Sequence, residues 1–312
     1  MFNPEKFIKE KSIWLKNEIR DNEAIVAASG GVDSSVTAII GHKVIGDKLK
    51  VIFLDDGLMR EGEPEAVKDL FKEMGINLTI FDVSKNFFNA MKGLTDPELK
   101  RKKFRETFYN TFTKIAKDLN IKIVLQGTIA PDIIETSKGV KTQHNVLEQI
   151  GINPLTKFGF KIIEPLIELY KPEVRMVAKK LGLPKQVVER KPFPGPGLSV
   201  RTLGEITSEK VNIVRKTSKI VEDETKNIPS FQAFAVLLND KATGVTDDGR
   251  RIYGNIVVVR VINSTDAMTA TPTKIPWETL EKIKNRITKE IPNITRVLYD
   301  ITSKPPSTIE YE

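Results

Sequence analysis

Short apolar runs alternate with amphipathic segments along the first 190 residues of the chain. Continuous apolar runs are typical of strands covered on both faces in a parallel sheet. Strands alternating with helices predict an open α/β sheet whose ligands bind at the carboxyl ends of the strands. The predicted strands are 23–29 (EAIVAAS), 50–56 (KVIFLDD), 77–83 (NLTIFDV), 121–127 (IKIVLQG) and 160–166 (FKIIEPL). An amphipathic helix is predicted at the N-terminus, and the spacing of apolar residues predicts further helices at 33–45, 63–73 and 86–119.

The run PFPGPG at 192–197 interrupts this pattern. Three prolines remove backbone donors and two glycines loosen the chain, so neither a regular helix nor a central strand is expected. We therefore predict two domains, residues 1–190 and 191–312, the second a smaller α+β unit with helices on a mostly antiparallel sheet. Its predicted elements are helices at 208–226 and 277–290 and strands at 231–238, 254–262 and 295–301.

Composition excludes several classes of protein. The 312 residues hold no cysteine, which rules out disulfides, thiolate nucleophiles and cysteine-based metal sites within this sequence, and two histidines are too few for a histidine-based metal cluster. No apolar stretch is long enough for a membrane span, and the start lacks the apolar centre of a signal peptide, so the cytoplasm is expected. The net charge of +8 suits anionic partners, but lysine-rich solvated surfaces also give such values, and nucleic-acid binding is not expected.

The segment SGGVDSS at 29–35 lies where a predicted strand runs into a helix. Backbone N–H groups gathered at a helix N-terminus bind anions. A plain turn in which Asp33 or a serine caps the helix is the alternative, but two adjacent glycines exceed what a cap needs and let backbone approach a bulky ligand. The GxxxxGK(S/T) and GxGxxG loops are absent. We favour a pyrophosphate site.

With its surroundings, SGGVDSS resembles the signature of the ATP pyrophosphatases, which cleave ATP between its α- and β-phosphates. Further segments resemble GMP synthetases, in particular the synthetase subunit of the two-subunit archaeal type, over nearly the whole chain. These segments are DGLMR at 56–60, DPELKRK at 96–102, QGTIAPDIIE at 126–135, PFPGPGLSVR at 192–201, DAMTA at 266–270 and ITSKPPSTIEYE at 301–312.

The resemblance implies conversion of xanthosine monophosphate (XMP) to GMP with ATP, Mg²⁺ and ammonia. Asp33, a candidate Mg²⁺ ligand, and Lys141, which would stabilise charge during adenylyl transfer, are the catalytic candidates. Phe53 and Leu54, together with Gly127, would line the adenine site, although apolar strand residues such as Phe53 and Leu54 more often belong simply to the core. The ATP-binding candidates are Ser29, Gly30, Gly31, Val32, Asp33, Ser34, Ser35, Phe53, Leu54 and Gly127.

The resemblance also assigns an XMP site to the second half of the chain and to one helix of the first. Lysine and hydroxyl groups suit a nucleotide phosphate or ribose, and a carboxylate accepts from a base N–H. One segment departs from the family: KTQHNVLEQIGINPL at 141–155 has Gln143 where a histidine is usual and lacks the family's glycine pair. The XMP-binding candidates are Arg101, Arg201, Gln232, Lys304, Thr308 and Glu310.

Two kinds of partner follow from the resemblance, a homodimer formed through residues 191–312 and a separate glutaminase subunit that supplies ammonia. NAD synthetase shares the SGGxDS loop but does not explain the PFPGPG and KPPSTIE segments. A tRNA thiolation enzyme usually requires a cysteine to relay sulfur. A non-catalytic nucleotide- or RNA-binding module is the alternative from another class.

Overall fold

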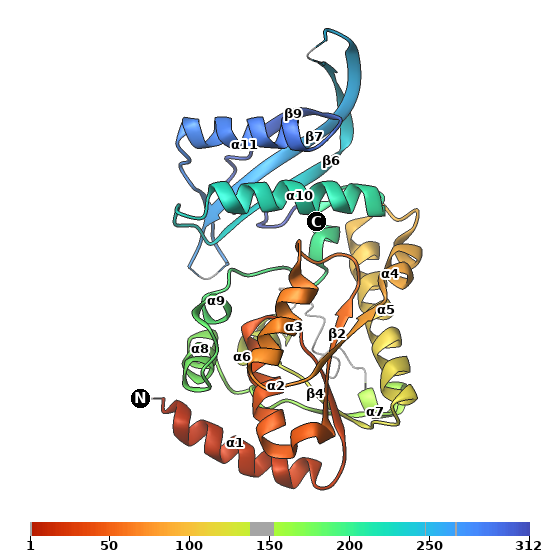
Figure 1. Ribbon diagram of the computed structural model, residues 1–312, viewed down its shortest axis with the longest axis vertical. Helices are drawn as coiled ribbons and strands as arrows, with labels where there is room; N and C mark the ends of the chain where they lie inside the picture. Colours follow the sequence, from red (N-terminus) through yellow and green to blue (C-terminus); the bar gives the residue numbers. More distant parts are fainter. Residues whose placement is uncertain (1, 138–152, 247, 266) are drawn as a thin grey trace. The chain divides into compact units, whose positions relative to one another are not determined.

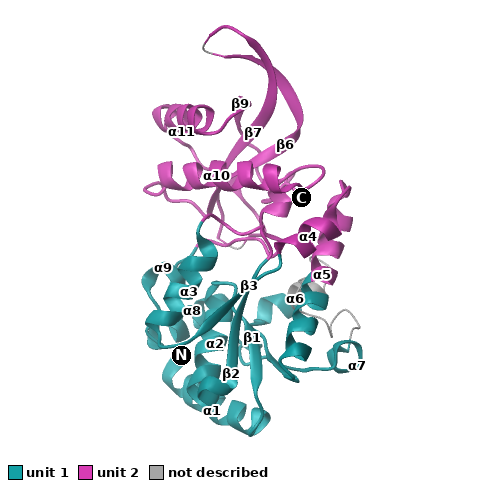
Figure 2. Cartoon of the chain, turned by 45° about the vertical axis from the view of Figure 1, so that its right-hand side comes forward, with its two compact units in different colours: residues 1–55, 62–83, 108–190 teal, residues 56–61, 84–107, 191–312 magenta. Residues whose placement is uncertain are grey.

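The computed structural model describes residues 2–137, 153–246, 248–265 and 267–312. The chain divides into two compact units that are interleaved in sequence (Figure 2). Unit 1 comprises residues 1–55, 62–83 and 108–190, and unit 2 comprises residues 56–61, 84–107 and 191–312. The contiguous ranges 1–190 and 191–312 stay a prediction, because two segments of the N-terminal half cluster with unit 2.

Unit 1 is built on a parallel sheet with the strand order β3-β2-β1-β4-β5, of which β2 and β4 are labelled in Figure 1 and β1, β2 and β3 in Figure 2. The chain runs outward from β1 through β2 to β3, and then returns to place β4 and β5 on the other side. The strand order therefore reverses at β1, which makes its carboxyl end a topological switch point, where α/β sheets bind ligands. The strands are β1 (Ala24–Ala27), β2 (Leu49–Asp55), β3 (Leu78–Asp82), β4 (Ile123–Leu125) and β5 (Lys161–Ile163).

Helices cover this sheet because each buries an apolar stripe against it or against a neighbouring helix. Helices α1, α2 and α8 pack against one another, and Asn3 caps α1 by accepting hydrogen bonds from two backbone N–H groups. An aromatic cluster that includes Tyr109, Phe112, Phe158 and Phe160 fills another part of the core. The helices are α1 (Pro4–Ile19), α2 (Val32–Ile45), the short η1 (Gly46–Lys48), α3 (Glu63–Glu73), α6 (Ala130–Ser137), α7 (Pro154–Phe158), α8 (Lys171–Lys180) and α9 (Lys185–Val188).

Unit 2 contains a mixed sheet in which β7 is the central strand. It pairs antiparallel with β6 and β8 and parallel with β9, while α10 packs on β6 and α11 packs on α10 and β9 (Figure 1). Helix α5 begins in unit 2 and ends in unit 1. The elements are α4 (Ser84–Met91), α5 (Pro97–Asp118), η3 (Gly197–Arg201), α10 (Ser208–Glu224), β6 (Gln232–Val245), β7 (Arg251–Asn263), β8 (Thr271–Pro272), α11 (Trp277–Glu290) and β9 (Ile294–Tyr299).

The predicted fold class is confirmed: an open parallel α/β sheet is joined to a smaller α+β unit. The parallel pairing of β9 with β7 is the main departure from a mostly antiparallel sheet. Among the described residues, no helix has the length and apolar character that crossing a bilayer requires.

Candidate functional site

The segment SGGVDSS forms the junction between β1 and α2, at the switch point of the sheet. Gly30 has φ of +75°, and a Cβ at this position would lie 2.4 Å from the Val67 side chain and 2.7 Å from Arg190 Nη1. Only glycine fits both the backbone conformation and the space. The positive φ of Gly30 therefore lets the chain turn sharply between β1 and α2, so that Gly31 becomes the N-cap of the helix.

Backbone N–H groups converge at this helix start. The first helical hydrogen bond of α2 runs from Ser35 N to Gly31 O at 3.0 Å, so the preceding N–H groups of the first turn have no intrahelical acceptor. Gly31 is the N-cap and supplies no side-chain acceptor. Val32, Asp33 and Ser34 thus direct their N–H groups away from the helix, as an anion site requires.

The serine hydroxyls play unequal roles in this loop. Ser34 Oγ accepts from Ser29 N at 3.2 Å and donates to Gly31 O at 3.1 Å, while the Ser29 and Ser34 hydroxyls lie 3.1 Å apart. Ser34 therefore fixes the loop conformation. Ser35 Oγ is buried and bonds to no atom of the described chain, which leaves its hydrogen-bonding capacity for a ligand.

Asp33 does not cap the helix; its carboxylate instead faces α8. Lys171 Nζ donates to Asp33 Oδ2 at 2.5 Å, and Asp33 Oδ1 is buried without a hydrogen-bond partner in the described part of the chain. Burial raises the pKa of Asp33, and the charge of Lys171 opposes that rise. A buried oxygen of a carboxylate normally has a partner, so Oδ1 is free to contact a ligand.

This half-paired carboxylate fits a magnesium ion brought in with nucleotide. Mg²⁺ takes oxygen ligands and is usually held by one or two carboxylates together with substrate phosphates and water. In the described ranges, no three His, Cys, Asp or Glu side chains form a group that could hold a metal ion by themselves. The residues present thus suit a metal whose coordination is completed by phosphate oxygens.

Gly127 follows β4 and packs against the start of α2. A Cβ at Gly127 would lie 3.0 Å from both Asp33 C and Ser34 N, so glycine allows the end of β4 to approach the loop closely. Phe53 and Leu54 lie near the end of β2 and are only 1% and 6% exposed. Leu54 packs in the same core cluster as the aromatic residues described above. Their side chains are part of the core, and a contact with adenine stays a prediction.

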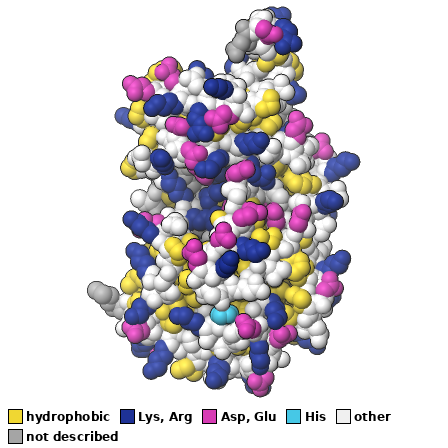
Figure 3. All heavy atoms as spheres, viewed as in Figure 1, with side chains coloured by type: hydrophobic (Ala, Val, Ile, Leu, Met, Phe, Trp, Pro, Cys, Tyr) yellow, Lys and Arg dark blue, Asp and Glu magenta, His cyan; other side chains and the backbone are white. Residues whose placement is uncertain are grey.

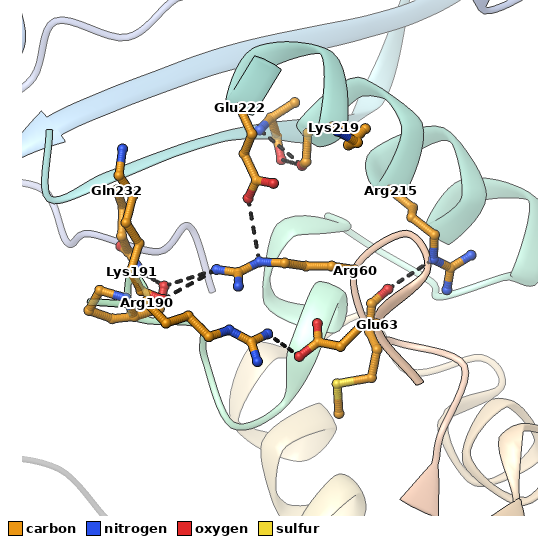
Figure 4. Close-up of polar contacts among 12 residues, drawn as sticks. Arg60, Glu63, Arg190, Lys191, Arg215, Lys219, Glu222 and Gln232 are labelled. Atoms are coloured by element: carbon orange, nitrogen blue, oxygen red, sulfur yellow. Dashed lines mark hydrogen bonds and ion pairs between the residues drawn. The ribbon is translucent and has the colours of Figure 1, made fainter. Parts of the chain in front are cut away.

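Three residues of unit 1 that sequence analysis missed support the phosphate loop. Lys171 pairs with Asp33, as described above, and Arg190 donates from Nη1 to Gly30 O at 2.8 Å. Arg190 Nη2 donates to Glu63 Oε1 (Figure 4). Arg190 therefore joins the glycine turn to the first turn of α3. The sequence signal that could have placed Lys171 is the start of helix α8, marked by a proline and a glutamate in the first turn after Tyr170. No local signal pointed to Arg190 or Glu63.

The candidate XMP residues of unit 2 form a separate group. Arg201 is 1% exposed and donates two hydrogen bonds of 2.8 Å to the Glu310 carboxylate. Its guanidinium carbon lies 3.9 Å from the centre of the Phe234 ring and 5.2 Å from that of Phe193. The Arg201 guanidinium thus pairs with a carboxylate and stacks on aromatic rings within unit 2, and it holds Glu310 in place.

Gln232 begins β6 beside this ion pair. Its Nε2 donates to Pro192 O at 2.9 Å and lies 3.4 Å from Glu310 Oε1, whereas its Oε1 is buried with no partner in the described residues. The amide thus connects the PFPGPG segment to the C-terminal tail. Its unpartnered oxygen can accept a hydrogen bond from a ligand.

The remaining candidates lie on accessible parts of unit 2. Lys304 Nζ donates to Ala267 O at 2.9 Å, and the exposed Thr308 bonds through its hydroxyl to Glu310 O. Arg101 is exposed on α5, where it pairs with Glu98 at 2.8 Å. Their contact with XMP stays a prediction, and Lys141 lies outside the described residues.

Lys100, the neighbour of Arg101, is the buried member of the KRK run. It donates to Thr202 O at 2.9 Å and Gly204 O at 3.0 Å, and it pairs with Glu312. Burial lowers the pKa of Lys100, while the Glu312 carboxylate counters this effect. Lys100 and Arg101 were not distinguished in the prediction, although Lys100 precedes the buried Phe104 of α5 by four residues, which places both on the same face of the helix.

The segment 56–61 is held within unit 2 by two arginines. Arg215 of α10 donates to Met59 O at 2.9 Å and to Gly57 O at 2.5 Å, while Arg60 lies 3.4 Å from the Glu222 carboxylate (Figure 4). The Arg60 guanidinium also stacks over Phe193 at 4.5 Å. These contacts fix the DGLMR motif against α10 and the PFPGPG segment.

Charge is mixed over the surface. On the face shown in Figure 3, Lys and Arg side chains are interspersed with Asp and Glu. Such mixing differs from the basic stripe that tracks a nucleic-acid backbone. On this face, the positive charge is therefore not gathered into one basic patch.

Comparisons with known proteins agree with this geometry. Residues 7–196 match the family model for NAD synthase, and residues 226–311 match that for the GMP synthase C-terminal domain. Among solved structures, NMN synthetase from Francisella tularensis has a similar fold, with a TM-score of 0.50, 18% identity, and coverage of 64% of this chain and 79% of that one. At this identity the likeness concerns the fold alone.

Curated relatives match over the full length, and each is a subunit of a glutamine-hydrolyzing GMP synthase. The protein from Methanocaldococcus jannaschii is 51% identical over 317 residues, covering 100% of both chains. The proteins of the same name from Methanopyrus kandleri and Archaeoglobus fulgidus are 50% and 52% identical, over 100% and 99% of both chains respectively. The chain therefore belongs to this family of GMP synthase subunits, and its nucleotide-binding unit is of the NAD synthase type.

Proposed function

We propose that this chain synthesises GMP from XMP, with cleavage of ATP to AMP and pyrophosphate and with ammonia from a separate glutaminase subunit. The observation that carries the proposal is the open helix N-terminus at Gly31–Ser34 beside the half-paired carboxylate of Asp33, in a chain about half identical to GMP synthase subunits. We place its activity in the cytoplasm, where ATP and XMP are available.

The chemistry follows from the weak electrophilicity of the xanthine C2 carbonyl, into which the ring nitrogens donate. Its O2 attacks the α-phosphorus of ATP, forming an O–P bond while the bond to the bridging oxygen breaks and pyrophosphate leaves. Ammonia then attacks C2, loses a proton, and AMP departs with the O2 oxygen. No side-chain nucleophile is required, so alignment and charge stabilisation carry the catalysis.

In unit 1, the N–H groups of Val32, Asp33 and Ser34 and the hydroxyls of Ser29 and Ser35 would bind the departing pyrophosphate. Asp33 would hold Mg²⁺ through Oδ1, while Lys171 keeps the other carboxylate oxygen occupied. When bound, the metal neutralises charge on the phosphates. Lys141 stays our candidate for stabilising charge on the α-phosphate.

In unit 2, we assign XMP binding to the tail and to the residues that support it. Lys304 and Thr308 suit the phosphate or ribose, and Glu310 suits a base N–H. Arg201 contributes by orienting Glu310, and Gln232 offers its unpartnered Oε1. Arg101, exposed on α5, is a cation for the nucleotide phosphate.

Pyrophosphate release measures this proposal directly. We expect XMP, and not IMP or deamido-NAD, to trigger Mg²⁺-dependent conversion of ATP to AMP and pyrophosphate. Stimulation by deamido-NAD would assign the chain to the NAD synthetases. ADP and orthophosphate as products, or no nucleotide cleavage with XMP, would contradict the proposal.

We also propose a homodimer formed through unit 2. The ground for this proposal is the resemblance to GMP synthetases, which implies an interface in residues 191–312. Unit 2 exposes large apolar side chains that association between copies would bury. Sedimentation at assay concentrations should give twice the chain mass of 35.1 kDa, whereas an active monomer would argue against the dimer. These exposed side chains are Leu99, Val245, Tyr253, Met268, Trp277, Leu298 and Ile301.

A further inference from the structure

Arg260 is a fully buried arginine in the middle of strand β7. It lies between Val259 and Val261, opposite Phe234 of β6, and it is 0% exposed. Burying a charge among apolar strand residues is unfavourable unless the charge is paired and hydrogen-bonded. The side chain therefore requires a specific set of acceptors.

The C-terminal tail supplies all of those acceptors. An arginine has five N–H donors in a fixed planar fork, and the structure gives five hydrogen bonds. Every acceptor falls between residues 300 and 309, and three of them are backbone carbonyls. The bonds are Nε to Ile309 O (3.1 Å), Nη1 to Asp300 Oδ2 (2.6 Å) and Thr302 O (3.1 Å), and Nη2 to Ser307 Oγ (2.9 Å) and Thr308 O (2.8 Å).

Asp300 links the beginning and the end of this tail through hydrogen bonds. Its Oδ2 also accepts from Tyr311 OH at 2.8 Å, and its Oδ1 accepts from Thr302 N at 2.8 Å. Burial raises the pKa of Tyr311, and the hydrogen bond to Asp300 raises it further, so the phenol stays a donor. Residues 300–311 thus form a loop gathered around one guanidinium.

Three candidate nucleotide ligands lie within this loop. Thr308 is held by Arg260 through its carbonyl while its side chain is exposed, and Glu310 is held by Arg201. The backbone of Lys304 pairs with Ala270 through two hydrogen bonds of 2.8 and 3.1 Å. Arg260 therefore determines the backbone path from which these side chains project.

We propose that Arg260 is a positioning residue for the nucleotide-binding tail, residues 300–312. It contacts no substrate itself; it fixes the tail carbonyls so that Lys304, Thr308 and Glu310 present a preformed surface to XMP. This inference rests on the proposed function, because it assigns the tail to XMP. A lysine cannot replace Arg260, because an ammonium has three donors and no planar fork.

The test compares Arg260→Gln and Arg260→Lys with a control, Arg251→Gln, at an exposed position of the same strand. Both Arg260 variants should raise KM for XMP by about 10–100-fold, since small misplacements of binding groups have effects of this size. KM for ATP at saturating XMP, which reports on unit 1, should change less than about twofold. The control should match the unchanged protein in both constants.

The split between the two constants separates positioning from general stability. An unchanged KM for XMP in a folded Arg260 variant overturns the proposal, and so does an equal rise in both constants. If Arg260→Gln does not fold, the lysine variant decides by the same criterion. If the unchanged protein neither binds XMP in calorimetry nor releases pyrophosphate with it, the proposed function fails, and this inference falls with it.

Discussion

Replacing Asp33 with asparagine is expected to slow XMP-dependent pyrophosphate release by about 10²–10³-fold, the effect typical of removing one preorganised electrostatic contact. The substitution keeps the shape of the side chain but removes its charge. Asp33 Oδ1 is buried without a partner among the described residues, and Lys171 contacts the other oxygen at 2.5 Å. A discontinuous assay of pyrophosphate release, repeated over a range of Mg²⁺ concentrations, measures this decrease in rate.

Stability should change little in this variant. The Lys171 and Asp33 side chains are 41% and 24% exposed, so their ion pair is partly screened and contributes on the order of 0–1 kcal/mol. Asp47→Asn, an exposed carboxylate just beyond the same helix, is the matched control and should retain full activity. Normal pyrophosphate release by Asp33→Asn would remove Asp33 from the catalytic site.

The second large effect concerns the source of nitrogen. The isolated chain should make GMP from XMP, ATP and ammonium, and the rate should rise toward alkaline pH as more ammonia is unprotonated. Glutamine should give no GMP, because hydrolysis of its amide by this class of enzyme uses a thiolate nucleophile and the sequence has no cysteine. The relatives are subunits of a glutamine-hydrolyzing GMP synthase, which fits a glutaminase on a separate chain.

Adding that glutaminase subunit should restore glutamine-dependent synthesis. The measurement is GMP formation by chromatography with ammonium alone, glutamine alone, and glutamine plus the partner. Ammonium with the isolated chain serves as the positive control for its activity. Efficient use of glutamine by the isolated chain would refute this division of labour.

Elements with strong local patterns could be predicted from the sequence. Helix α3 has the predicted bounds 63–73, and the strands of unit 1 differ from their predicted ranges by a few residues at most. Helix α8 was missed although Pro172 and Glu173 mark its first turn. The direction of β9 could not be predicted, because its parallel pairing with β7 is a long-range contact that no local period indicates.

The same distinction applies to the site. The phosphate loop was predictable because its chemistry lies in seven consecutive residues, 29–35. Its supports were not, because Lys171 is 138 positions from Asp33 and Arg190 is 160 positions from Gly30. Arg201 shows a further limit: its residue type indicated an anion, but the anion it binds in the structure is Glu310 of the chain itself.

The interleaving of the two units has a consequence for how the protein is made on the ribosome. Residues 84–107 belong to unit 2, but the larger part of that unit, residues 191–312, is synthesised much later. In the folded chain Lys100 bonds to Thr202, Gly204 and Glu312. At about 5–20 residues per second, Lys100 waits on the order of 5–20 s for Thr202 and Gly204 and on the order of 10–40 s for Glu312. The nascent chain therefore carries Lys100 without its folded-state acceptors until residues 202–204 are made, and unit 2 folds only once nearly all of the chain has emerged.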